Sequence, residues 1–82
     1  MKEQASTKDE LFLLCLYEEA LKQPNLDDPL DRYAVGKLAG LQSRGVNAIC
    51  KLLLKANFIK KEGESGIYIT PHGVKLAEKL HR

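Results

Sequence analysis

The sequence lacks the features that mark membrane-spanning, disulfide-stabilised and zinc-binding proteins. No apolar run approaches the roughly 20 residues that cross a bilayer, and the N-terminal MKEQASTKDE has no apolar stretch typical of a signal peptide. We therefore expect a cytoplasmic protein with no membrane contact. The two cysteines, Cys15 and Cys50, have no histidine pair nearby, so no metal site is expected. In a reducing cytosol both should be buried free thiols.

The groups that catalytic sites require are also missing. His72 and His81 stand apart from each other, and no glycine-rich phosphate loop occurs. Acidic pairs such as Asp27–Asp28 are adjacent, and neighbours on a helix do not face one substrate together. We therefore expect no enzymatic activity, no catalytic residues, no cofactor and no small-molecule substrate.

Acidic residues are absent from one long part of the chain. Residues 32–61 carry seven Lys and Arg and no Asp or Glu, although the net charge of the chain is only +2. Residues 1–31 carry three basic and eight acidic side chains, and residues 62–82 carry three of each. This asymmetry favours an anionic partner on one face. A solvated polar surface is the alternative that charge alone leaves open.

The first half of the chain predicts three helices. The first covers residues 6–24, with a capping box of Thr7 and Glu10 and a stop at Pro24. Residues 1–6 are polar, and we expect them to be frayed. The expected apolar side of this helix consists of Leu11, Leu14, Cys15, Ala20 and Leu21, widened by Phe12, Leu13, Leu16 and Tyr17.

A second helix is expected to start at Asp28 as N-cap with Pro29 in its first turn, and to end at Gly40. A third is expected from Ser43, as cap, to about residue 56, with Asn57 at its C-terminus.

The pattern then changes to short segments rich in β-branched and aromatic residues. FIKKE and GIYIT flank the tip GES, which predicts a β-hairpin. Thr70 before Pro71 starts a last helix as N-cap and first residue. The apolar positions of that helix are Val74, Leu76, Ala77 and Leu80.

The segment VGKLAGLQSRGVNAI resembles the helix-turn-helix pattern. Gly36 occupies the small-residue position where two helices cross, and Gly40 follows four residues later at the tight turn. Leu41 is the apolar anchor, and Val46 lies on the inner face of the second helix. Helices that meet steeply across a short turn require small crossing sites and apolar anchors.

The following segment, LLKANFIKKEGESGIYITPHGVKLAEKL, is similar to the recognition-helix end, wing and next helix of bacterial and archaeal winged-helix regulators. The resemblance runs from about residue 11 to residue 80. It implies a mainly α protein with a small β-hairpin, organised as one winged helix-turn-helix domain over residues 1–82. A three-helix core, a two-stranded wing and a C-terminal helix are expected.

The third helix has an apolar and a basic side at about 100° per residue. The apolar side is formed by Val46, Ile49, Cys50 and Leu53. The basic side is formed by Arg44, Ala48, Lys51 and Lys55, with Asn47 at its edge. Such a face fits a major groove about 12 Å wide.

The resemblance implies a role for each polar residue on double-stranded DNA. Ser43, Arg44 and Asn47 are candidates for base-edge contacts, because Arg pairs bidentately with guanine and Asn with adenine. The candidate phosphate contacts are Lys51, Lys55, Lys60, Lys61, Arg32 and Lys37. The resemblance also implies that the protein is a small transcriptional regulator.

Two features depart from that pattern. Glu62 and Glu64 make the hairpin tip acidic, which repels phosphates. Leu52 and Leu54 flank the core side of the third helix, and with the terminal helices they suggest a homodimer with two recognition helices. Two alternatives follow: a winged-helix module that binds protein instead of DNA, or one domain of a larger assembly with its basic face on RNA.

Overall fold

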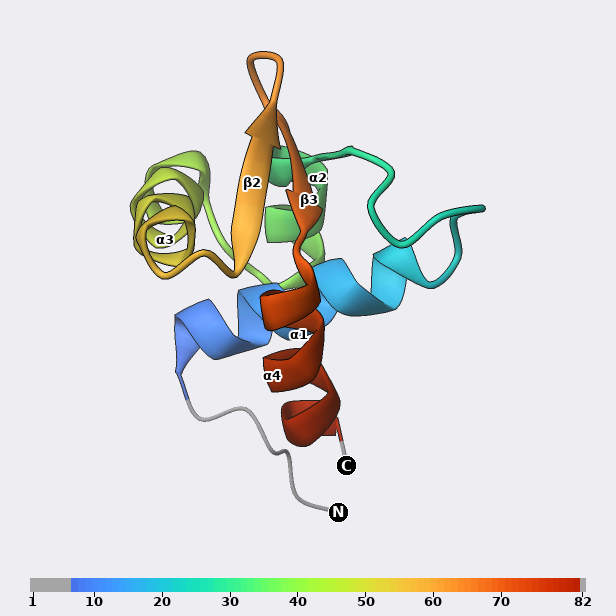
Figure 1. The fold of residues 1–82 in the computed structure, drawn as a ribbon. Helices are drawn as coiled ribbons and strands as arrows, with labels where there is room; N and C mark the ends of the chain where they lie inside the picture. The colour runs from blue at the N-terminus through green and yellow to red at the C-terminus, as the bar shows by residue number, and fades with distance from the viewer. Residues whose placement is uncertain (1–6, 82) are drawn as a thin grey trace.

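The chain forms four helices and three short strands in a computed structural model that describes residues 7–81 (Figure 1). The expected fraying of residues 1–6 lies outside the described residues. In chain order the elements are α1 (Lys8–Ala20), β1 (Leu30–Asp31), α2 (Arg32–Leu38), α3 (Ser43–Lys55), β2 (Ile59–Glu62), β3 (Gly66–Ile69) and α4 (Pro71–His81).

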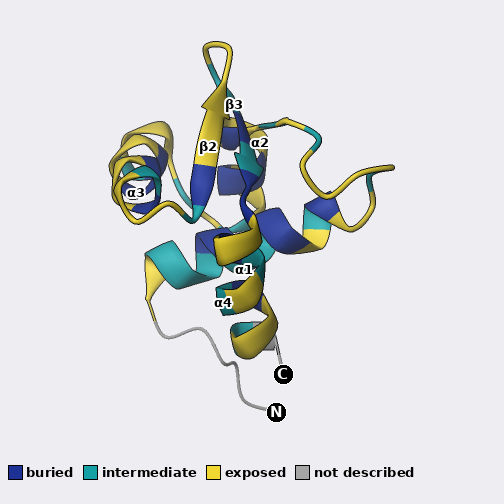
Figure 2. Cartoon of the chain, in the orientation of Figure 1, coloured by how far each residue is buried: buried dark blue, intermediate teal, exposed yellow. Residues whose placement is uncertain are grey.

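Helix α1 lies at the centre of the molecule and packs against α2, α3, α4 and β3. Thr7 caps it as expected, because its Oγ1 accepts a hydrogen bond of 3.3 Å from the Glu10 backbone N–H. The expected apolar side needs correction: Leu21 is 54% exposed, and Leu14 and Cys15 are only partly buried. The side that enters the core consists of Phe12, Leu13, Leu16, Tyr17 and Ala20 (Figure 2).

The start of α2 differs from the sequence expectation. Asp28 and Pro29 do not begin the helix, which starts at Arg32 after the N-cap Asp31. The two residues before Arg32 form β1, which pairs antiparallel with β3. The sheet therefore has three strands in the order β1-β3-β2. Backbone pairing with a distant strand determines this short segment, and local sequence carries no sign of it.

The α2–α3 turn confirms the helix-turn-helix spacing. A Cβ on Gly36 would overlap Val46 Cγ2, so the helices cross where only hydrogen fits. Gly40 has φ +75°, a left-handed conformation that favours glycine. The Leu41 N–H donates to the Gly36 carbonyl at 2.8 Å, which closes the turn. Leu41 packs against the core as the expected anchor.

The N-cap of helix α3 differs from the expected one, whereas the residue at its C-terminal end is the expected one. Gln42 is the N-cap, and Ser43 is the first helical residue. At the other end Asn57 adopts φ +64°. The Asn57 N–H donates to Leu54 O at 3.1 Å and the Phe58 N–H to Leu53 O at 3.0 Å, which is the Schellman pattern.

The predicted hairpin is present as β2 and β3, and β3 is the central strand of the three-stranded sheet. Ile59 pairs with Ile69 at the base, and Glu62 pairs with Gly66 beside the hairpin tip, which we define as residues 62–65. Thr70 joins the hairpin to α4 as expected: its Oγ1 accepts from Gly73 N–H at 3.0 Å and donates to Asn57 O at 2.6 Å. This hydroxyl therefore fixes the end of α3 relative to the start of α4.

Candidate nucleic-acid interface

The outer face of α3 presents the polar side chains that the sequence assigned to it. Ser43, Arg44, Asn47, Lys51 and Lys55 are all exposed. The opposite side of the helix is buried against the core through Val46, Ile49, Cys50 and Leu53. Burial of that apolar side fixes which residues face outward, because a helix places positions three and four apart on the same face. Figure 2 shows the exposed outer side of this helix.

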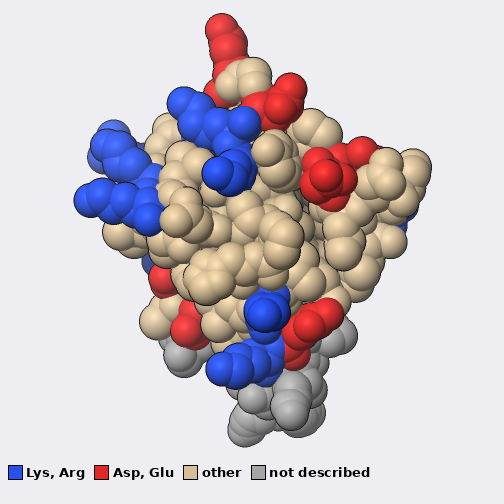
Figure 3. All heavy atoms as spheres, viewed as in Figure 1, with Lys and Arg blue, Asp and Glu red and all other residues tan. Residues whose placement is uncertain are grey.

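Cations gather on this face and on the neighbouring strand. Lys60 and Lys61 are exposed on β2, which packs beside α3, and Lys37 is exposed on α2. Figure 3 shows Lys and Arg side chains clustered over α3 and β2, with acidic side chains at the hairpin tip. Within residues 7–81 none of the exposed cations on α2, α3 and β2 forms an ion pair. Their charge is therefore available to an external anion.

Arg32 occupies a different place from the one expected for a phosphate contact. Its side chain is only 8% exposed. Its Nε donates to Ser65 O at 3.2 Å and its Nη2 to Glu64 O at 3.3 Å. The Arg32 backbone N–H also donates to Ser65 O at 3.0 Å. Arg32 therefore holds the hairpin tip against α2 and is not part of the exposed basic face.

Asn47 has a partner that sequence reasoning missed. The Tyr33 hydroxyl on α2 donates to Asn47 Oδ1 at 2.9 Å, and both side chains lie at the surface. Tyr33 is 39% exposed. The two residues are 14 positions apart and lie on different helices, so periodicity along a single helix does not relate them. No sequence signal could have paired them, because the contact depends on the crossing of α2 and α3.

The hairpin tip is held on α2 at the Glu64 and Ser65 carbonyls, its end extends beyond the helices in Figure 1, and its acidic side chains are exposed. Glu62 and Glu64 are both at the surface, and Gly63 turns the chain with φ +72°. A negatively charged tip is repelled by phosphates. In any approach of this face to nucleic acid, α3 and the lysines of β2 supply the attraction.

The thiols lie away from this face. Cys50 is buried in the core and Cys15 is half-buried, and both are free. Burial raises the pKa of the Cys50 thiol, an effect that the nearby Arg32 charge partly opposes. Burial also raises the pKa of the Cys15 thiol, with Glu18 and Glu19 adding to the effect. Both cysteines are therefore neutral thiols at physiological pH.

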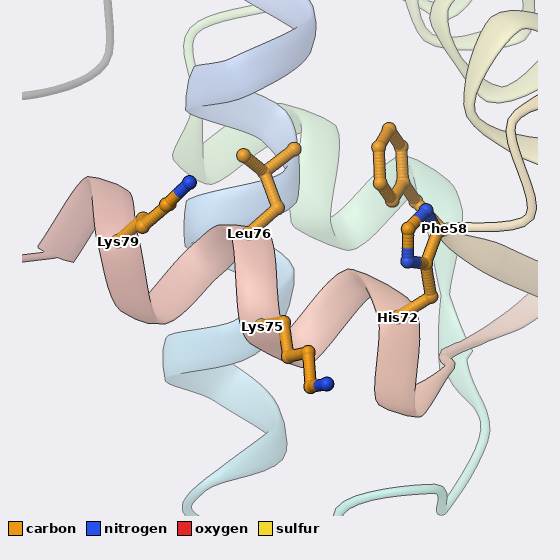
Figure 4. A pocket seen from close by; sticks show the side chains of 5 residues that line it. All are labelled: Phe58, His72, Lys75, Leu76 and Lys79. Carbon is orange, nitrogen blue, oxygen red and sulfur yellow. The ribbon is translucent and has the colours of Figure 1, made fainter.

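A separate hollow of about 430 Å³ lies on α4, lined by Phe58, His72, Lys75, Leu76 and Lys79 (Figure 4). The Phe58 and His72 rings stack with centroids 4.7 Å apart and planes 17° apart. Lys75 points away from Leu76 in this view. The stack joins the residue before β2 to the first turn of α4, and the residues that line the hollow include no paired nucleophile and base.

Two further observations concern the part of the chain that the structure describes. It contains no group of three or more His, Cys, Asp and Glu side chains placed to hold a metal ion. None of its helices combines the length and the apolar character needed to cross a bilayer.

The arrangement of these elements is similar to that of a solved protein. The PcaV transcriptional regulator from Streptomyces coelicolor, solved in complex with its natural ligand, superposes with a TM-score of 0.72 over 98% of this chain. The chain has the winged-helix fold. Sequence identity is 17%, and the match spans 55% of the regulator's chain, so the likeness concerns the fold. No protein-family model and no curated protein matches the sequence.

Proposed function

We propose that this winged-helix protein binds double-stranded DNA through the outer face of α3 and acts as a small transcriptional regulator. The observation that carries the proposal is a set of exposed cations that form no ion pair within residues 7–81: Arg44, Lys51 and Lys55 on α3 and Lys60 and Lys61 on the adjoining β2, with Lys37 also exposed on α2. The winged-helix fold supports it, because the solved protein that shares this architecture is a transcriptional regulator.

In this proposal the polar residues on the outer face of α3 have two different roles. Ser43, Arg44 and Asn47 lie in the first turns and reach base edges in the major groove. Lys51 and Lys55 lie further along the helix, and with Lys37 and the β2 lysines they contact phosphates. Arg32 is left out, because its guanidinium is buried under the hairpin tip.

Charge reversal on α3 tests the proposal against a control of equal net charge. The variant Arg44→Glu/Lys51→Glu reverses two charges on the proposed face, and Lys75→Glu/Lys79→Glu reverses two exposed charges on α4. Each double substitution replaces two cations with two anions, so the net charge changes from +2 to −2 in both.

Fluorescence anisotropy of a labelled random duplex at about 50 mM salt then reads out affinity. The α3 variant should lose measurable binding, whereas the α4 variant should keep most of the wild-type affinity. Equal losses in both would show that only net charge matters, and an unchanged affinity of the α3 variant would remove α3 from the interface. Circular dichroism confirms that both variants are folded.

The acidic hairpin tip and the exposed Leu52, at 58%, favour a second candidate, a module that binds protein. In that case wild-type protein would not bind duplex DNA even at low salt. RNA is a further candidate ligand of the same basic face, and an RNA duplex in the same assay tests it.

The homodimer expected through Leu52, Leu54 and the terminal helices stays a prediction. Leu54 is half-buried and packs on the core, so Leu52 is the better of the two contacts.

A further inference from the structure

An exposed hydrogen bond joins the two helices of the helix-turn-helix. It runs from the Tyr33 hydroxyl, in the first turn of α2, to Asn47 Oδ1, in the second turn of α3. A bond at the surface adds little to stability, because water can replace either partner. Its location is more informative, since Asn47 is one of the three residues proposed to face base edges.

The chemistry of the two groups determines how the amide is oriented. A carboxamide has an acceptor end and a donor end, and rotation about χ2 exchanges them. A phenol donates better than it accepts, because its oxygen lone pairs are delocalised into the ring. The hydroxyl therefore holds the amide oxygen toward α2 and leaves the nitrogen at the open side. Among the residues that the structure describes, no group accepts a hydrogen bond from Asn47 Nδ2.

We propose that Tyr33 is a specificity-determining residue that acts by positioning Asn47, so that Asn47 presents a hydrogen-bond donor to the major groove. This inference rests on the proposed function. A fixed donor pairs with guanine O6 or N7, adenine N7 or thymine O4. Cytosine presents an amino donor at the same edge, and two donors facing each other are repulsive. One position of the binding site should therefore exclude cytosine on the contacted strand.

The effect of Tyr33 on base preference is separable from affinity for the phosphate backbone of DNA. Neither Tyr33 nor Asn47 carries a charge, so neither contributes to the release of counterions from phosphates. Removing the Tyr33 hydroxyl frees the amide to rotate and to accept from the cytosine amino group. The substitution Tyr33→Phe should therefore change which base is accepted and leave the salt dependence of binding unchanged.

The experiment begins with selection of preferred sites from a randomised duplex pool by the wild-type protein. The position read by Asn47 is the one whose preference disappears in Asn47→Ala. Four duplexes that differ only there are then titrated with wild type, Tyr33→Phe and the control Tyr68→Phe. Tyr68 lies on β3 opposite Lys60 and takes no part in the Tyr33–Asn47 hydrogen bond.

Wild type and Tyr68→Phe should bind the cytosine duplex about tenfold more weakly than the best of the other three. Tyr33→Phe should reduce this difference to about twofold, with an unchanged salt slope. The proposal is overturned if Tyr33→Phe keeps the wild-type preference, if wild type favours cytosine there, or if selection returns no preferred base, while salt-dependent binding persists. Absence of duplex binding by wild type would overturn the proposed function as well.

Discussion

The sequence predicts that Arg32 contacts phosphate, whereas the structure buries its side chain under the hairpin tip, and a substitution at Arg32 tests which role holds. In Arg32→Met the aliphatic stem remains and the guanidinium is lost, together with its bonds to Ser65 O and Glu64 O. Hydrogen bonds to charged groups contribute about 1.5–3 kcal/mol each. Both bonds here are at the long end of the usual range, and Ser65 O keeps its bond to the Arg32 backbone N–H. We therefore expect a loss of about 2 kcal/mol in the free energy of unfolding.

Urea denaturation followed by circular dichroism measures this loss, and a thermal melt should show a decrease of about 10 °C. Arg32→Lys should lose about 1 kcal/mol, because an ammonium cannot reach both carbonyls with fixed geometry. The control is Lys37→Met on the same helix, where the side chain is exposed and stability should be unchanged.

DNA binding separates the two roles proposed for these cations. The salt slope of Arg32→Met should equal that of wild type, whereas Lys37→Met should lower it by about 0.9, the value for one phosphate contact. The reasoning is refuted if Arg32→Met unfolds at the wild-type urea concentration and lowers the slope by about one unit. That result would make Arg32 a phosphate contact after all.

Four other tests concern the core, the thiols and the exposed leucine. Gly36→Ala should lower stability by about 2 kcal/mol in a urea melt, because overlap with Val46 exceeds the gain in helix propensity; an equal or higher midpoint would contradict this close crossing. A thiol reagent should label Cys15 before Cys50, which is fully buried. Burial raises the pKa of the Cys50 thiol above its ordinary value of 9.0, so the stability that this thiol contributes is present below pH 9.0 and is lost as the pH rises through the folded pKa. The free energy of unfolding of Cys50→Ala should therefore decrease less steeply at alkaline pH than that of wild type. Leu52→Ser should raise the dissociation constant of any dimer in sedimentation velocity, and a monomeric wild type at tens of micromolar would remove the dimer from the account.

The parts of the fold that sequence predicted are those determined by local chemistry. Thr7 and Thr70 act as caps through their own hydroxyls, and Gly40 and Asn57 take left-handed conformations at helix ends. The spacing of Gly36 and Val46 was also readable, because the segment resembles the helix-turn-helix pattern, which has a small residue where the two helices cross. Winged-helix architecture follows from the order of these elements.

The parts that sequence missed depend on contacts between distant segments. Strand β1 is two residues long and exists through pairing with β3. The burial of Arg32 depends on the hairpin tip returning to α2, 32 and 33 residues later. The apolar side of α1 was misassigned because the helix is apolar on most of its circumference, so periodicity could not show which side packs.

The candidate site was also predictable only in part: the residues exposed on α3 were, and their contact with α2 was not. The outward direction of Arg44, Asn47 and Lys51 follows from the buried side of α3. The Tyr33 hydroxyl at Asn47 required the three-dimensional crossing of α2 and α3.

The most direct test of the central claim is the salt dependence of wild-type binding to a labelled random duplex between about 50 and 200 mM salt. A protein that neutralises about four to six phosphates should lose roughly two to three decades of affinity over this range. That loss is the result predicted for the basic face of α3 and β2. Absence of binding at the lower salt, or an affinity that does not change with salt, would contradict DNA binding through this face.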